Sequence, residues 1–229
     1  MERHPSRTTQ TENRWPVAVA LLLALALYAF LPSSLFPEQR LVVIGLALLL
    51  MVPLVIMNPR RLNQETRWSR IIGLVLALLL VASNQVTIVF LIGDLVAGSR
   101  DTSGLLLSSL QVWVTNAIAF ALLYWELDRG GPVARALTAR DQLPPADFRF
   151  PQDEDDDAVT EVATRSSKVE DWMPSFVDYL YTSASTSMAY SATDAMPLSH
   201  RFKLLNLLQA FGSFVILALV IARAVNILA

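Results

Sequence analysis

Long stretches of apolar residues constrain this chain more than any other feature of its sequence. They run for roughly 17 to 25 residues, about what an α-helix needs to cross the ~30 Å hydrocarbon core of a bilayer. The chain is 54% hydrophobic and only 17% charged, whereas a soluble domain carries about 25% charged residues. The sequence therefore predicts an all-α, polytopic helical bundle in a membrane, and it excludes a soluble globular enzyme.

Six transmembrane helices are predicted. The four N-terminal segments are 15–31, 41–57, 71–92 and 105–125, and the last two are 173–193 and 204–228. No small-x-small cleavage pattern follows the first segment, so we expect an uncleaved helix rather than a signal peptide. The chain then divides into an N-terminal four-helix membrane part at 1–125, an acidic cytoplasmic linker at 126–172, and a C-terminal helix pair at 173–229.

The linker is expected to be disordered because of its composition. It contains Gly130-Gly131-Pro132, Pro144-Pro145 and the acidic run from Asp153 to Asp157. Consecutive carboxylates in such a tract can attract a divalent cation, but they are more often simply solvated. We therefore expect no metal site there.

The arginine and lysine distribution predicts the orientation, because cytoplasmic loops collect these residues. With six crossings and the N-terminus inside, the outer loops hold only Arg40, Arg100, Arg201 and Lys203 of the chain's 18 basic residues. The prediction is a multi-pass protein of the cell membrane with both termini in the cytoplasm.

The segment 173–193 is rich in hydroxyl groups. In a helix, Ser183, Ser187 and Ser191 fall four residues apart and form one stripe. Small residues at this spacing let membrane helices approach closely, which makes the stripe a packing surface; alternatively, the hydroxyls line a polar path. The residues assigned to this packing stripe or path are Ser183, Thr186, Ser187, Tyr190, Ser191, Thr193 and Asp194.

Four amide side chains lie well inside apolar sequence. They are Asn84, Gln85, Gln111 and Asn116. An amide without a partner in lipid costs several kcal/mol, so these groups must face other helices or water. We expect hydrogen bonds between helices, with Asn206 and Gln209 as candidate partners, and a substrate site is the alternative.

Leu180 to Ser199 resembles the pore-loop region of two-helix potassium channels. Leu180-Tyr181, Ser183, Thr186, Asp194 and Pro197 match the family pattern in register. Where the family has V-G-Y-G, this chain has Tyr190-Ser191-Ala192-Thr193, so the resemblance does not imply potassium selectivity. A pore loop entering from outside conflicts with the charge distribution. The conflict disappears if the segment crosses fully or dips in from the cytoplasm.

A second resemblance covers roughly the second half of the chain. It is carried by YWELDRGGP at 124–132, DFRFPQ at 147–152, the run FVDYLYTSASTSMAYSATDAMPLS at 176–199 and ARAVNIL at 222–228. These segments are similar to a bacterial, largely actinobacterial, family of multi-spanning membrane proteins of unknown function. The resemblance implies family membership and no particular activity.

Enzyme chemistry is not expected. The sequence has no GxSxG, HExxH or GxxxxGK[ST] motif and no cysteine, and its two histidines, His4 and His200, are far apart. We therefore predict no catalytic residue, cofactor or metal. The expected partners are the lipid bilayer, further copies of the chain and an ion or small solute; a net charge of -2 favours neither nucleic acid nor anionic lipid. Two functions stay open: a channel-like protein with a degenerate pore loop, or a structural or accessory membrane protein.

Overall fold

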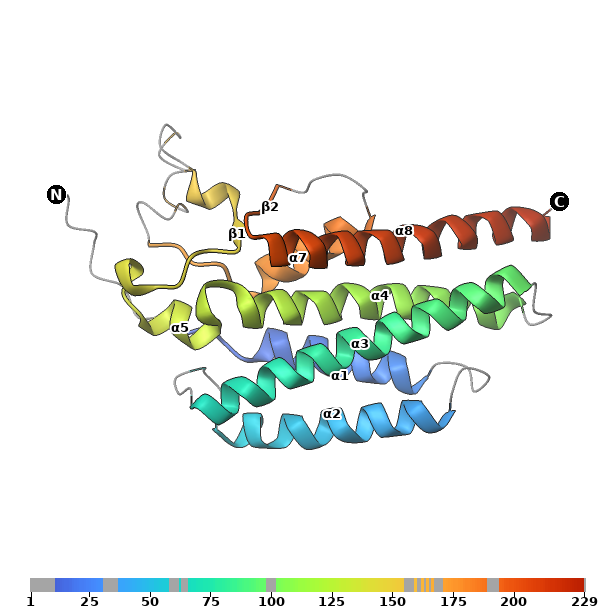
Figure 1. Cartoon of the computed structure of the whole chain (residues 1–229), viewed down its shortest axis with the longest axis horizontal. Coiled ribbons are helices and arrows are strands. Elements are labelled where there is room, and N and C mark those ends of the chain that lie inside the picture. Colours follow the sequence, from blue (N-terminus) through green and yellow to red (C-terminus); the bar gives the residue numbers. More distant parts are fainter. Residues whose placement is uncertain are drawn as a thin grey trace.

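The computed structural model describes residues 11–30, 37–57, 62, 66–97, 102–154, 159, 162, 164, 166, 171–188 and 194–228. Its helices are α1 (Trp15–Ala29), α2 (Pro37–Met57), α3 (Arg67–Ala97), α4 (Thr102–Leu127), α5 (Pro132–Leu137), α7 (Phe176–Met188) and α8 (His200–Leu228) (Figure 1). Two-residue strands β1 (Phe148–Arg149) and β2 (Met196–Pro197) pair antiparallel, and 3₁₀ turns cover Asp128–Gly130, Arg140–Gln142 and Pro151–Asp153. The predicted all-α class is confirmed.

Helix α4 is the centre of the bundle. It packs against α1, α3, α7 and α8, and every side chain from Ala117 to Trp125 is buried. A helix that is apolar on all sides is stable only when other helices surround it. Helices α1 to α4 run alternately in opposite directions, and α2 lies on the outer side of α1 and α3 (Figure 1).

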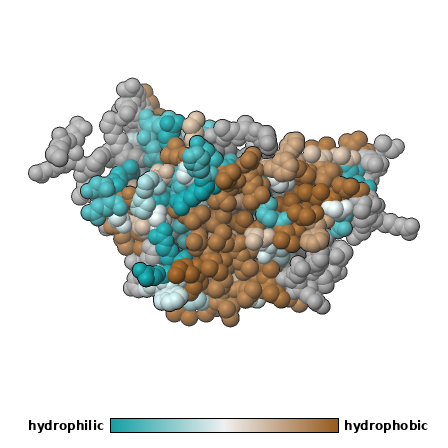
Figure 2. Space-filling model, in the orientation of Figure 1, coloured by the Kyte–Doolittle hydropathy of each residue, from teal (hydrophilic) through white to brown (hydrophobic). Residues whose placement is uncertain are grey.

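The outer surface of the bundle is largely apolar. Figure 2 shows a broad hydrophobic area over the middle of one face, with hydrophilic residues gathered at one end. Within the described residues, three helical stretches are long and apolar enough to cross a membrane: Arg67–Val96, Gly104–Gly130 and His200–Val225. Trp15–Ala29 and Leu41–Met57 are apolar but shorter. This composition is consistent with a membrane protein.

Helix α7 does not cross the bundle. It has 13 residues, which at 1.5 Å per residue is about 20 Å, well short of a ~30 Å hydrocarbon core. Helices α7 and α8 begin at the same end of the molecule and run in the same direction (Figure 1). The chain therefore runs part-way along the bundle with α7, is back at the end where α7 began when β2 starts, and then runs the length of the bundle with α8 (Figure 1). The described helix α7 is shorter than the crossing predicted for 173–193, of which residues 189–193 lie outside the described residues, and the number of crossings stays a prediction.

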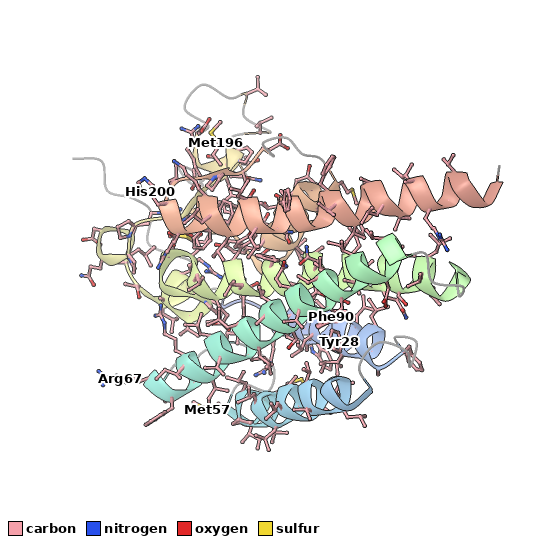
Figure 3. The ribbon with its side chains drawn as sticks, turned by 45° about the vertical axis from the view of Figure 1, so that its right-hand side comes forward. Tyr28, Met57, Arg67, Phe90, Met196 and His200 are labelled. Carbon is pink, nitrogen blue, oxygen red and sulfur yellow. The ribbon has the colours of Figure 1, made fainter. Side chains whose placement is uncertain are left out.

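We call the end of the bundle that carries residues 128–154 the cap end. Figure 3 shows Met57, Arg67, Met196 and His200 toward this end. Helix α1 begins there and α8 ends at the opposite end (Figure 1). The two ends of the described chain therefore lie at opposite ends of the bundle, whereas six full crossings would place both at the same end.

The expected disorder of the linker is not found in residues 128–154. This part folds onto the bundle because Phe148 and Phe150 are buried at 0% and 4% exposure. The chain reverses after α4 through positive φ angles at Arg129 (50°), Gly130 (84°) and Gly131 (93°). Two successive glycines suit this reversal because they lack the Cβ that opposes such angles. Asp155 to Asp157 of the acidic run lie outside the described residues.

Candidate functional site

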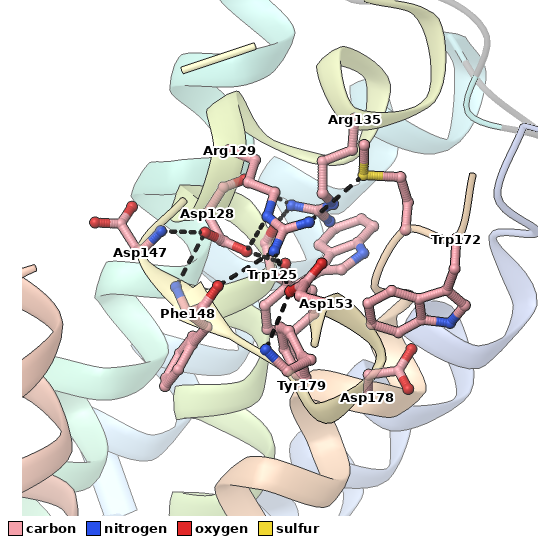
Figure 4. A network of polar contacts seen from close by, with 12 residues as sticks. Trp125, Asp128, Arg129, Arg135, Asp147, Phe148, Asp153, Trp172, Asp178 and Tyr179 are labelled. Carbon is pink, nitrogen blue, oxygen red and sulfur yellow. Dashed lines mark hydrogen bonds and ion pairs between the residues drawn. The ribbon is translucent and has the colours of Figure 1, made fainter. Parts of the chain in front are cut away.

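A buried network of charged side chains joins the end of α4 to the start of α7 (Figure 4). Asp128 is fully buried. Its carboxylate accepts hydrogen bonds from the Tyr179 hydroxyl at 2.5 Å and from the backbone N–H of Asp147 at 2.6 Å. The carboxylate also lies 3.6 Å from the Arg129 guanidinium. One carboxylate thus holds three segments that are far apart in the sequence.

Arg129 balances the negative charge of this network. Its guanidinium donates to the Asp153 carboxylate at 2.7 Å and to the Phe148 carbonyl at 3.2 Å. Only 7% of its side chain is exposed, and a charge so placed is tolerated when it is paired and hydrogen-bonded. These bonds also fix the left-handed backbone of Arg129. The ion pairs that Arg129 forms with Asp128 and Asp153 are therefore largely buried.

Arg135 is the second cation of the network. Its Nη1 donates to the carbonyls of Trp125 and Asp128, each at 2.8 Å. The guanidinium carbon lies 5.0 Å from the centre of the Tyr179 ring, within the distance at which a cation is attracted to an aromatic face. Its Nε and Nη2 atoms have no hydrogen-bond partner within the described part of the chain. Arg135 thus covers the C-terminal carbonyls of α4, where a cation stabilises the helix dipole.

The segment that follows α7 is fastened to the same network. Strands β1 and β2 pair Phe148 with Pro197, and the N–H of Leu198 donates to the Asp147 carbonyl at 2.7 Å. The Arg201 guanidinium donates two hydrogen bonds to the Asp147 carboxylate. These contacts bring the chain back to the cap end before α8 begins.

Glu12, which precedes α1, joins the N-terminal segment to α7. Its carboxylate accepts from the Phe176 N–H at 2.5 Å and from the Trp125 indole N–H at 2.9 Å. Burial raises the pKa of Glu12, and the nearby Arg135 charge opposes this shift. The acceptor satisfies a free N–H of the first turn of α7, where a negative charge is favourable.

The hydroxyl stripe lies between α7, α4 and α8. Ser183 and Ser187 are buried at 0% and 3% exposure. The side-chain amide of Gln209 donates to both hydroxyls, at 2.7 and 2.9 Å, and Ser183 donates to the Ala117 carbonyl at 2.6 Å. Tyr124 completes the group by donating to the Gln209 amide oxygen at 2.9 Å. Within one copy of the chain, the polar groups of Ser183, Ser187, Gln209 and Tyr124 therefore have hydrogen-bond partners.

No comparable hydrogen bonds are described for the remaining members of the stripe. Thr186 is buried, and its hydroxyl has no hydrogen-bond partner among the described residues. Asp194 is described and exposed. Tyr190, Ser191 and Thr193 lie outside the described residues.

The predicted deep amides form a second group along α4. Asn84 and Gln85 both donate to the Asn116 amide oxygen, at 2.9 and 3.0 Å, and the Asn116 nitrogen donates to the Ser213 hydroxyl at 2.9 Å. Three helices are thereby joined. Gln111 instead reaches the Phe30 carbonyl at 3.4 Å.

The partner of these amides on α8 is therefore Ser213 rather than the expected Asn206 or Gln209. Gln209 instead donates hydrogen bonds to Ser183 and Ser187 of α7, and it lies one helical turn nearer the cap end than Ser213. The described residues contain no cluster of three or more acidic or histidine side chains able to hold a metal ion.

The cap network was not predicted, although its sequence signal is visible. The segments that meet there, 124–132, 147–152, 176–179 and 196–199, belong to the runs that carry the resemblance to the bacterial membrane family.

The fold and these sites define a class: within the described residues it is a helical protein with three helices long and apolar enough to cross a membrane, a 13-residue helix α7 and a folded polar cap. Comparison with models of protein families, with curated proteins and with solved structures gives no match. Membership of the bacterial family stays a prediction that the resemblance alone supports.

Proposed function

We propose that the chain is a multi-pass membrane protein with five crossings and one helix that re-enters from the cytoplasm. The cap end is then cytoplasmic. The charge distribution supports this orientation, because Arg201 and Lys203 move to the cap end when α7 turns back. Of the 18 basic residues, only Arg40, Arg100 and Arg223 belong to the opposite end by their position along the chain.

We further propose a channel-like function. The observation that carries it is the course of the chain: a half-length helix, a return segment and a crossing helix follow one another, which is the order of a pore loop. The C-terminal end of α7 lies part-way along the bundle, and the last carbonyls of a helix carry partial negative charge that favours a cation. The solute of this proposal is therefore a small cation, passing beside the C-terminal end of α7.

A passage requires more than one copy in this proposal, because Ser183 and Ser187 are bonded within the chain. A stripe of α7 is available to a second copy: Val177, Tyr181 and Met188 are 56%, 61% and 65% exposed. If such faces meet around an axis, the C-terminal ends of α7 from neighbouring copies lie close to that axis. The inner hydroxyls then position α7, and its C-terminal end contacts the ion.

The structural or accessory function remains the second candidate. It is favoured by a specific observation: Gln209 satisfies the buried hydroxyls, and Asn116 joins three helices. Such bonds stabilise a bundle by about 0.6 kcal/mol each on average. In this alternative the polar interior has no solute.

Reconstitution distinguishes the two functions. Purified protein in liposomes is tested for K⁺ and Na⁺ flux with a potential-sensitive dye. The channel-like function predicts a flux that Ser191→Phe changes several-fold, because this residue follows the last residue of α7, Met188, by three positions in the sequence. Leu207→Phe is the matched control, since it adds similar bulk at a position on α8 that is 56% exposed.

Absence of flux from protein that unfolds cooperatively and reconstitutes in both orientations would support the accessory function. Equal flux in the Ser191→Phe and wild-type proteins would place the passage elsewhere in the assembly.

A further inference from the structure

A pocket lies at the cap end between α1, α2, α3 and α4, away from the hydroxyl stripe. It encloses about 820 Å³ of empty space, including the part that is open to the outside. The pocket is separate from the channel-like function proposed above, because its lining includes no residue of α7 or α8.

The wall of the pocket is apolar toward the middle of the bundle. Leu21 from α1, Leu54 from α2, Ala77 from α3 and Leu122 from α4 contribute to it. The α1 residues that line it run from Arg14 to Leu21, which is about 10 Å along a helix. The length suits part of one hydrocarbon chain.

Polar groups of the pocket gather at its cap-end rim. Arg14, Ser69, Arg70 and Glu126 supply them. Two guanidinium groups face one carboxylate, so the rim carries a net positive charge. Guanidinium groups recognise phosphate oxygens through paired hydrogen bonds. An apolar wall below a cationic rim matches an amphiphile whose anionic head lies at the membrane surface.

Gly73 leaves room for the Glu126 carboxylate at the rim. A Cβ atom at this position would lie 2.6 Å from Oε1 of Glu126, so the carboxylate rests directly against the backbone of α3. With the Glu126 carboxylate held there, Arg70 at the exposed start of α3 is positioned beside the mouth of the pocket.

We propose that this pocket binds one anionic phospholipid of the surrounding bilayer, with an acyl chain between the four helices and the phosphate at Arg70 and Arg14. The inference relies on the membrane location proposed above and not on ion conduction. Lipid binding is measured without any flux assay, so the two proposals fail independently.

The test uses the full-length protein, delipidated in mild detergent, with phosphatidylglycerol and phosphatidylcholine of identical acyl chains as probes. Native mass spectrometry measures the affinity for each lipid. We expect a several-fold preference for phosphatidylglycerol. Arg70→Gln should weaken phosphatidylglycerol binding about tenfold, which corresponds to the loss of one charge-assisted contact.

Two matched controls separate the pocket from general charge and bulk. Arg67→Gln removes an exposed cation three residues earlier on α3, outside the pocket lining, and should leave the preference unchanged. Ala18→Phe fills the pocket and should abolish binding, whereas Val19→Phe enlarges a 58% exposed neighbour and should not.

Equal binding of both lipids by all proteins would overturn the proposal, as would equal losses in Arg67→Gln and Arg70→Gln. If inorganic phosphate displaces phosphatidylglycerol and stabilises the protein to the same extent, the occupant is a soluble anion and the lipid assignment is wrong. Retained binding in Ala18→Phe would place the lipid on the outer surface.

Discussion

The hydroxyl of Tyr179 donates to the carboxylate of Asp128 at 2.5 Å, and neither side chain is exposed. This contact joins the first turns of α7 to the end of α4. It fixes where α7 starts against the end of α4, because Asp128 is held in turn by the backbone N–H of Asp147.

Tyr179→Phe removes this hydroxyl and leaves the buried Asp128 with one partner fewer. We expect a loss of about 1–3 kcal/mol in the free energy of unfolding, since a buried acceptor loses its donor. Thermal unfolding in detergent measures it. Tyr181→Phe is the control, because Tyr181 is 61% exposed. Equal unfolding temperatures for the two variants would show that the contact contributes nothing.

Gln209→Leu removes the amide that bonds Ser183 and Ser187. The shape is nearly retained, so the loss reports on hydrogen bonds; we expect destabilisation of about 1–2 kcal/mol. A double-mutant cycle of Gln209→Leu with Ser187→Ala should give a coupling of about 0.6 kcal/mol or more. Strict additivity would contradict the 2.9 Å contact between Gln209 and the Ser187 hydroxyl.

Glu12 should make stability depend on pH. Burial raises the pKa of Glu12 above its ordinary 4.5, so the folded state binds this proton more tightly than the unfolded state does. The contribution is complete below pH 4.5 and is lost as the pH rises through the folded pKa.

Relative to Glu12→Gln, the wild-type protein should therefore lose stability as the pH rises across this interval and then level off. Thermal unfolding at a series of pH values checks the sign. Glu154→Gln is the control, because the Glu154 side chain is 51% exposed. A wild-type protein that gains stability over the same interval would show that Arg135 and the hydrogen bonds, not burial, dominate at Glu12.

Gly130→Ala should destabilise the cap. Gly130 has a φ of 84°, and an added Cβ would lie 3.1 Å from Cγ of Pro144. We expect a cost of about 1–2 kcal/mol from the backbone conformation alone. Gly93→Ala is the control, since nothing lies within 4 Å of a Cβ at Gly93. Similar stability of both variants would argue against a rigid reversal after α4.

Much of the helical framework could be predicted from sequence, because uninterrupted apolar blocks have few other stable arrangements. The positions of the deep amides were also informative: Asn84, Gln85 and Asn116 lie in three-way contact because buried amides need partners. Their partner on α8 was not predictable, since it depends on the relative rotation of α4 and α8.

The return of the chain to the cap end between α7 and α8 could not be predicted from composition. Residues 173–193 have the length and hydropathy of a short crossing, so local sequence favours a span. What decides the course is long-range: the pairing of Phe148 with Pro197 and of Asp147 with Arg201 returns the chain to the cap end. The cap was missed for a related reason, because charges that pair only in the folded protein are indistinguishable in sequence from solvated ones.

Membrane topology tests the central claim most directly, and the chain has no cysteine to interfere. Single cysteines at Ser199 and at Ala229 are labelled in intact cells with a membrane-impermeant thiol reagent. Five crossings and a re-entrant α7 predict that Ala229→Cys is labelled, whereas Ser199→Cys reacts only after permeabilisation. Labelling of Ser199→Cys in intact cells, with Ala229→Cys protected, would mean that 173–193 crosses the membrane and would contradict the account.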